Sequence, residues 1–230
     1  MTPEPEDLRK WRLPRGRHGL PRELVTRSQR ERLLAAVVRA TAAKGYGATT
    51  VADVLEEAGV GRETFYELFD DKRACALAAH RALSADLEGT VRDAYMEPGR
   101  WPERACQAVA ETLAWFAADP AAARFMMVEV GAMGTDYRER FQAEFSRFVS
   151  LIEDGLEGWS PEVNQAASLA VTALFARLHE EIARGRAAEL PSLLPDLTYE
   201  MLVPFLGEAP AWAERSRVIA RGPAGPNASR

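Results

Sequence analysis

Side chains that could contact a partner through hydrogen bonds and charge are concentrated in residues 49–72. A short helix is predicted at residues 61–69, because three apolar residues recur there at helical spacing: Phe65, Leu68 and Phe69. The 100° turn per residue places four other side chains on the opposite, exposed side: Arg62, Glu63, Tyr66 and Glu67. A guanidinium, two carboxylates and a phenol hydroxyl can bind phosphate oxygens and base edges, which is the chemistry of recognition.

Catalytic chemistry is not indicated. The three histidines, His18, His80 and His179, lie in separate predicted elements. We find no Gly-rich phosphate loop, His-x-x-x-His pair or nucleophile elbow, and the glutamates after His179 lack the second histidine of a zinc helix. Cys75 and Cys106 are the only cysteines, so we expect free thiols in a reducing compartment. The sequence predicts neither an enzyme, nor a metal site, nor a cofactor.

The charge is unevenly distributed along the 230 residues, whose net charge is −5. Residues 9–44 contain eleven Lys or Arg against two Glu, whereas residues 81–230 contain 15 basic and 22 acidic side chains. This gradient suggests that one end meets a polyanion, although a merely solvated basic surface would look the same. The longest nearly apolar stretch, residues 166–176, is too short to cross a bilayer. The N-terminus lacks the apolar core of a secretion signal, so we expect a cytoplasmic protein without a membrane partner.

The elements that position residues 49–72 are predicted to be helices. A first helix is expected from an N-cap at Ser28 to Lys44, a second from Thr49 or Thr50 to Ala58, and a fourth from residues 70–71 to about residue 95. Gly59 permits a tight turn before the third helix, which gives a helix-turn-helix. In that motif the second helix enters the major groove of DNA. The alternative is an ordinary three-helix packing unit in which Tyr66 is half-buried and the threonines are only caps.

Residues 44–72 resemble the DNA-binding region of the tetracycline-repressor (TetR) family without a gap. The matching segments are Lys44-Gly45-Tyr46, Thr49-Thr50-Val51, Ala58-Gly59-Val60, Thr64-Phe65-Tyr66, Phe69 and Lys72. Residues 13–20 and 185–191 resemble members common in actinobacteria.

The resemblance implies that Thr64, Tyr66 and Lys72 contact the DNA backbone and that Arg62 approaches bases. Gly61 replaces the serine of many members, which weakens the N-cap of the third helix. Glu63 and Glu67 would repel phosphates but could accept a hydrogen bond from a cytosine amino group. The expected DNA-binding residues are Thr49, Thr50, Gly61, Arg62, Glu63, Thr64, Tyr66 and Lys72.

The whole chain is predicted to be all-α, with about nine helices. Its expected parts are a flexible basic arm (1–26), the helix-turn-helix domain (27–72), a helical effector-binding and dimerisation domain (73–212) and a disordered tail (213–230). The arm could follow a minor groove or remain solvated. Further helices are expected at residues 102–118, 120–132, 135–157, 161–186 and 196–206.

Dimerisation is expected because one helix-turn-helix contacts only a few base pairs. The helix at 161–186 carries an apolar row and a second row of mostly small residues, which suits packing on its own core and on a partner. In the family, the last two long helices of each subunit form the dimer bundle. The expected interface residues are Val163, Ala167, Ala170, Leu174, Leu178, Leu197, Met201 and Phe205.

A cluster of bulky apolar residues could line a cavity for an unknown small apolar effector, although plain core packing would explain each of them. The candidate effector residues are Trp115, Phe116, Phe125, Met126, Glu129, Met133, Phe145, Phe148 and His179. The function predicted from these features is a dimeric regulator of transcription, a repressor released from a palindromic double-stranded operator by the effector. The alternative is an all-helical protein–protein interaction module that does not bind DNA.

Overall fold

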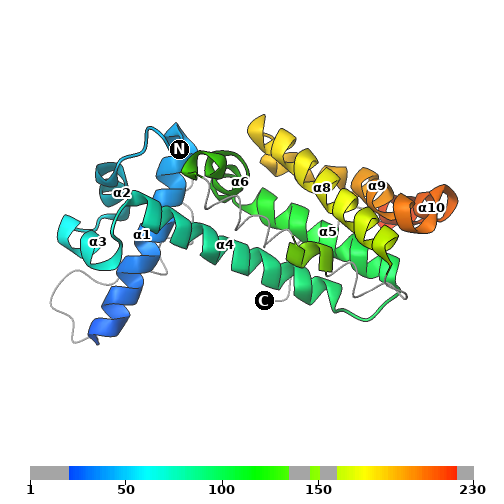
Figure 1. Ribbon diagram of the computed structural model, residues 1–230, viewed down its shortest axis with the longest axis horizontal. Helices are drawn as coiled ribbons and strands as arrows, with labels where there is room; N and C mark the ends of the chain where they lie inside the picture. Colours follow the sequence, from blue (N-terminus) through cyan, green and yellow to red (C-terminus); the bar gives the residue numbers. More distant parts are fainter. Residues whose placement is uncertain (1–20, 135–145, 151–159, 222–230) are drawn as a thin grey trace. The chain divides into compact units, whose positions relative to one another are not determined.

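The computed structural model describes residues 21–134, 146–150 and 160–221, and all regular secondary structure in these residues is helical (Figure 1). The predicted all-α class is therefore confirmed. Two compact units divide the chain between His80 and Arg81, a boundary that falls inside α4.

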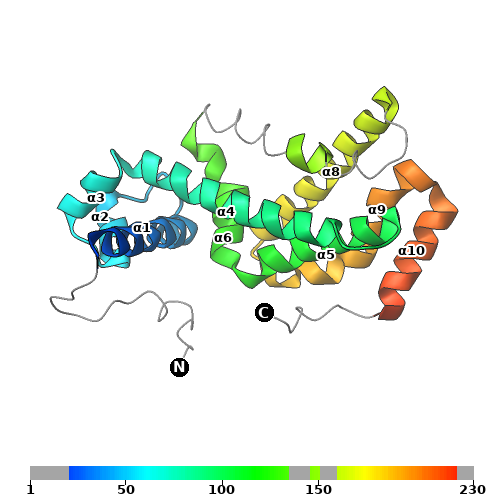
Figure 2. The same ribbon diagram turned by 90° about the horizontal axis from the view of Figure 1, so that it is seen from below.

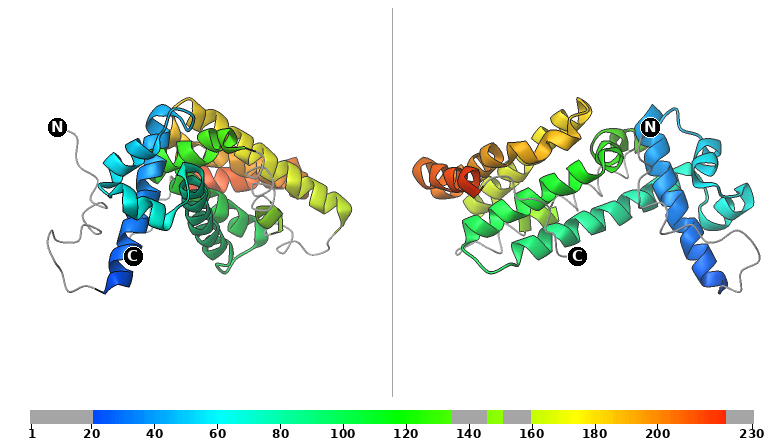
Figure 3. Two further views of the ribbon diagram at one scale, coloured as in Figure 1. Left: turned by 60° about the vertical axis from the view of Figure 1, so that its left-hand side comes forward. Right: turned by 180° about the vertical axis from the view of Figure 1, so that it is seen from behind.

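The first unit is built from three helices and the start of a fourth: α1 (Arg22–Lys44), α2 (Val51–Ala58), α3 (Arg62–Leu68) and α4 (Lys72–Tyr95). Its core is formed by side chains from all four helices, and the fully buried ones include Leu33, Val37, Val54, Phe65 and Cys75. Figures 1 and 3 show that the N-terminal turns of α1 extend beyond α2 and α3.

The helix α1 begins at Arg22, so the expected start at Ser28 is wrong. Pro21 has an extended ψ of 137°, and its carbonyl accepts the N–H groups of Leu24 and Val25. Because a proline before the first turn has no N–H to leave unsatisfied, the helix can start directly after it. Ser28 is instead a buried residue inside α1, and residues 22–26 of the expected arm are helical. The end at Gly45 is as predicted, with φ 85° and its N–H bound to the Thr41 carbonyl.

The turn between α2 and α3 depends on Gly59, which has φ 59° in the left-handed region. A Cβ atom at this position would lie 2.9 Å from Nη2 of Arg32. The same guanidinium donates hydrogen bonds to the carbonyls of Ala58 and Gly59. Arg32 on α1 therefore holds the turn in place, and this fixes where α3 begins.

The second unit contains the rest of α4 and a set of shorter and longer helical elements. These are α5 (Trp101–Ala118), α6 (Pro120–Arg124), the π-helical turn η2 (Phe125–Glu129), the 3-10 turns η3 (Val130–Met133) and η4 (Ala187–Leu193), α8 (Pro161–Ala183), α9 (Leu194–Leu206) and α10 (Glu208–Arg221). α5 packs against η4 and α9, α8 crosses α9, and α10 folds back beside α9 (Figure 2). Among the described residues, no helix has the length and apolarity needed to cross a membrane.

Two expectations for this unit are corrected. The single helix expected at 120–132 is divided into α6, η2 and η3. Residues 208–221 form α10, so the disordered tail expected from residue 213 is wrong as far as Arg221. The helix breakers Gly222 and Pro223 lie beyond α10, and within it Glu214 is buried and paired with Arg100 and Arg217. Most of the helix expected at 135–157 lies outside the described residues, although 146–150 are helical.

Candidate nucleic-acid interface

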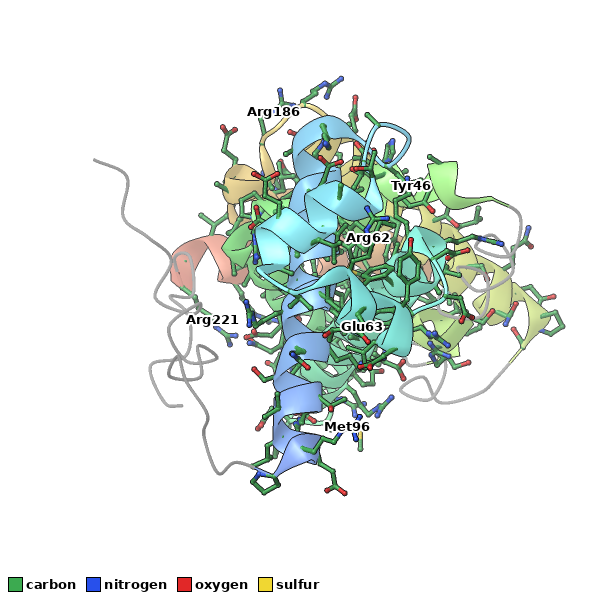
Figure 4. All side chains as sticks on the ribbon, turned by 90° about the vertical axis from the view of Figure 1, so that its left-hand side faces the viewer. Tyr46, Arg62, Glu63, Met96, Arg186 and Arg221 are labelled. Carbon is green, nitrogen blue, oxygen red and sulfur yellow. The ribbon has the colours of Figure 1, made fainter. Side chains whose placement is uncertain are left out.

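The helix α3 separates its apolar side chains from its polar ones. Phe65 is fully buried and Phe69 nearly so, whereas a polar group of side chains is exposed on the other side: Arg62, Glu63, Tyr66 and Glu67. We call these four residues the reading face. Figure 4 looks onto this side of the unit and shows Arg62 and Glu63 projecting from α3 toward the viewer.

The side chain of Tyr66 is 49 % exposed, which is a large apolar surface for a helix of seven residues to leave in solvent. Its ring meets the buried ring of Phe65 edge-on, with 5.3 Å between the centroids and 86° between the planes. This contact orients the tyrosine from its base while leaving half of the side chain in solvent. An amphipathic ring held in this way can contact a phosphate or a thymine methyl group.

The two threonines before α2 have different surroundings. Thr49 is 2 % exposed, and its hydroxyl lies 2.8 Å from the Gly45 carbonyl, to which it donates. Thr50 is exposed and forms a capping box with Asp53, in which each side chain binds the other residue's backbone N–H. Thr50, and not Thr49, therefore has a side chain within reach of a ligand at the start of α2.

Lys72 is bound inside the unit. Its Nζ lies 2.7 Å from the Tyr46 carbonyl and 2.6 Å from the Thr49 carbonyl, and 4.1 Å from the centre of the Tyr46 ring. Burial lowers the pKa of Lys72 from its ordinary value. These bonds join α4 to the segment before α2, so Lys72 has a structural role that its position in the sequence did not reveal.

Most other cations in the described part of the first unit also have internal partners. Arg39 and Glu57 lie 2.6 Å apart, Lys44 and Asp53 2.5 Å, and Arg27 and Glu31 3.0 Å, while Arg30 lies over the Phe69 ring. In contrast, Arg62 makes no ion pair or hydrogen bond with any described residue. For residues 21–44, the count of basic residues therefore overestimates the positive charge available to a polyanion.

The two remaining expected residues lie at the start of α3. Gly61 is the N-cap, with extended backbone and no side-chain hydrogen bond to the helix, and a Cβ atom here would meet open space. Thr64 is partly buried. Gly61 can thus offer only its backbone to a ligand, and α3 lacks a side-chain N-cap.

Of the cavities enclosed by described residues, one is lined by an expected effector residue. A cavity of about 40 Å³ lies between α4, α5, α8 and α9, and Phe148 is the only expected residue that lines it among those described. Its other walls are apolar or small, including Val91, Ala108, Val109 and Met201. The alanines and Thr112 at helical spacing on α5 are the sequence signal that could have indicated this space.

The other expected effector residues have structural partners. Phe116 and Phe125 are fully buried, Met126 is 7 % exposed, and Trp115 donates to Asp86 at 2.7 Å. Glu129 pairs with Arg124 at 3.0 Å, and His179 donates from Nδ1 to the Met127 carbonyl at 2.7 Å. The Met133 side chain and Phe145 lie outside what the structure describes.

Burial within the chain itself covers most of the residues expected at the dimer interface. Residues on the expected row are already covered: Ala167, Ala170, Leu174, Leu178, Leu197 and Met201. Val163 and Phe205 are partly buried, and the Phe205 ring packs on Trp101. The opposite side of α8 is exposed, with Leu169 at 62 % together with Ala173 and Ala176. On α8, a partner could therefore cover the outward row rather than the buried one.

Neither thiol is available as a nucleophile at neutral pH. Both cysteines are free, and burial raises the pKa of Cys75 to about 12 and that of Cys106 to about 11. A thiol that stays protonated is a poor nucleophile. Among the described residues, no three metal-ligating side chains come together.

Comparison with known proteins agrees with this geometry. Residues 33–79 match the family described as "Bacterial regulatory proteins, tetR family". The structure resembles the fatty acid degradation regulator FadR from Bacillus halodurans, with 17% identity, a TM-score of 0.67, and coverage of 76% of this chain and 94% of that one. No protein of the curated set matches the sequence.

Two further solved structures share the fold. FadR from Bacillus subtilis in complex with stearoyl-CoA is 15% identical, with a TM-score of 0.66 over 77% of this chain and 98% of that chain. A gamma-butyrolactone receptor described as ArpA-like is 17% identical, with a TM-score of 0.63 over 84% of this chain and 97% of that chain.

Proposed function

We propose that this chain is a dimeric repressor of transcription of the tetR family of bacterial regulatory proteins, whose family model residues 33–79 match. In this proposal it binds a palindromic double-stranded operator through α3 and is released when a small apolar molecule occupies the second unit. The observation that carries the proposal is the reading face, where Arg62 and Tyr66 are exposed on a short helix anchored by buried Phe65. A protein with this role acts in the cytoplasm, where the chromosome is.

Dimerisation is proposed through the outward side of α8. In a dimer, two copies of α3 about one DNA turn apart contact two half-sites and provide the specificity that a single α3 lacks. Exposed Leu169 with the small side chains of Ala173 and Ala176 forms a surface on which a second α8 can pack closely.

The effector is proposed to enter at the cavity beside Phe148. The cavity of about 40 Å³ has room for little more than a water molecule, whereas a ligand site needs several hundred Å³. Occupation would therefore displace the helices around it, and a ligand that binds only the displaced state shifts the population toward it. The similar structure that contains stearoyl-CoA supports an effector with an apolar part, since the stearoyl chain of that molecule is apolar. Since α4 belongs to both units, it is the covalent connection through which such a change can reach α3.

The test is a binding titration with DNA fragments from the protein's own gene neighbourhood. The proposal expects a saturable shift on a palindromic fragment that weakens steeply as salt increases, because bound phosphates release counterions. Binding that is absent at low salt on every fragment, with the protein folded and dimeric, would favour the protein–protein interaction module instead.

A further inference from the structure

The reading face has an unusual charge for a surface that meets DNA. It contains one cation, Arg62, and two carboxylates, Glu63 and Glu67, and all three are exposed. None of these three side chains forms a hydrogen bond or an ion pair with any residue in the described part of the chain. Lys72 and Arg39, two other cations of the same unit, are bound to other partners.

A carboxylate between two rows of phosphates is repelled unless it accepts a hydrogen bond there. The major groove offers two amino donors, adenine N6 and cytosine N4. Beside its amino group, adenine presents the acceptor N7, which repels a carboxylate, whereas cytosine presents only the donor. An ionised glutamate on this surface therefore selects cytosine.

Arg62 has the complementary preference. Its guanidinium presents a fork of donors that matches the O6 and N7 acceptors of guanine. Arg62 and Glu63 are consecutive residues in the first turn of α3, the part of a helix-turn-helix that contacts base edges. Successive side chains on a helix point about 100° apart, so Arg62 and Glu63, both labelled in Figure 4, leave α3 in different directions and can contact different bases.

We propose that α3 reads G·C pairs in each operator half-site, with Arg62 on a guanine and Glu63 on the amino group of a cytosine. This inference rests on the proposed DNA-binding function. It makes Glu63 a specificity-determining residue: it weakens binding to DNA in general and restores affinity only where a cytosine is in reach.

The first experiment is selection of bound sequences from random DNA, followed by titrations of wild-type protein and Glu63→Gln on the selected site. Replacing the contacted C·G pair by A·T should cost wild type about 10-fold in affinity. In Glu63→Gln that preference should be lost or reversed, because glutamine can both donate to N7 and accept from N6 of adenine. Selection that yields no enriched sequence with wild type would overturn the proposed function itself. An enriched site lacking G·C pairs at the contacted positions would overturn only this inference.

A matched control separates base reading from simple charge removal. Glu56→Gln removes the same charge from an exposed position of α2 and should leave the base preference unchanged. If Glu63 only repels the backbone, Glu63→Gln will tighten binding to all sites equally and keep the wild-type preference, and the inference fails.

Guanine reading by Arg62 is tested with 7-deazaguanine, which lacks the N7 acceptor. Wild type should lose about 10-fold on the substituted duplex, while Arg62→Ala, already weaker, should lose nothing further. An equal loss in both proteins would assign the guanine contact to another residue and contradict the proposal.

Discussion

Lys72 and Arg62 are both cations near the same helix, yet their side chains have different partners. The Nζ of Lys72 finds carbonyls at Tyr46 and Thr49, which are 26 and 23 positions away in the chain. No sequence spacing indicates such a bond, because it exists only once α4 has packed beside the segment before α2. The exposure of Arg62 and Tyr66, in contrast, follows directly from the 100° step and buried Phe65. For single residues, the sequence predicted correctly which side chains of α3 are exposed, but it could not predict partners that are distant in the chain.

We predict that Lys72→Met destabilises the first unit by about 1–3 kcal/mol, because two carbonyls lose a charged donor. Urea unfolding followed by circular dichroism measures this change. Arg62→Ala, which removes an exposed side chain without a described partner, should shift the midpoint little. Equal stability of wild type and Lys72→Met would show that the bonds from Lys72 are not formed in solution.

The boundaries of the helices show which elements the sequence can define. Gly45 and Gly59 end α1 and α2 as expected, since each adopts a positive φ that other residues resist. The start of α1 and the presence of α10 were missed because Pro21 and the run before Gly222 permit helix as well as coil. The division of residues 120–133 into α6, η2 and η3 has no sequence signal. Part of it depends on a distant residue, since His179 from α8 binds the Met127 carbonyl in η2.

The start of α2 gives the first unit a dependence on pH. Hydrogen bonds from Lys44, then from the hydroxyl and backbone of Thr50, hold the pKa of Asp53 well below its usual value. A lowered folded-state pKa contributes stability above the unfolded pKa of about 4, and this contribution is lost as the pH falls below it. We predict that Asp53→Asn is less stable than wild type at pH 7 and that the difference shrinks below about pH 4. Denaturant midpoints of both proteins at pH 7, 5 and 3 measure this difference in stability. A difference that does not change with pH would contradict the lowered pKa of Asp53.

For the whole molecule, the sequence predicted a DNA-binding part and a part for dimerisation and effector binding. It did not indicate which surface of the second part serves each purpose. The all-α class and the helix-turn-helix followed from periodicity, whereas the two rows of α8 could not be told apart. Both rows are apolar or small, and only packing against α9 and η2 decides which one is buried. The position of the cavity could not be predicted for the same reason. Large aromatic residues such as Phe116 fill the core, and the cavity lies beside small residues such as Ala108.

We predict that Leu169→Glu gives a monomer that binds an operator of two half-sites at least about 100-fold more weakly. In the dimer, binding of one α3 to its half-site holds the second α3 close to the other half-site, and the monomer lacks this gain. A carboxylate on this side of α8 would be buried against the partner without a counter-ion. Sedimentation velocity and a DNA titration check the two effects together. Met96→Glu, which places the same charge on another exposed apolar position, should remain dimeric. A dimeric Leu169→Glu would move the interface to another surface.

The most direct test of the central claim is the equilibrium affinity of Tyr66→Ala for the selected operator, measured by fluorescence anisotropy beside wild type. Ile219→Ala is the control, since Ile219 is an equally exposed apolar residue on α10. If the reading face meets the double helix, Tyr66→Ala should bind about 10-fold more weakly to the operator and to its base-pair variants alike, with Ile219→Ala unchanged. Wild-type affinity in Tyr66→Ala would show that α3 does not present this surface to DNA.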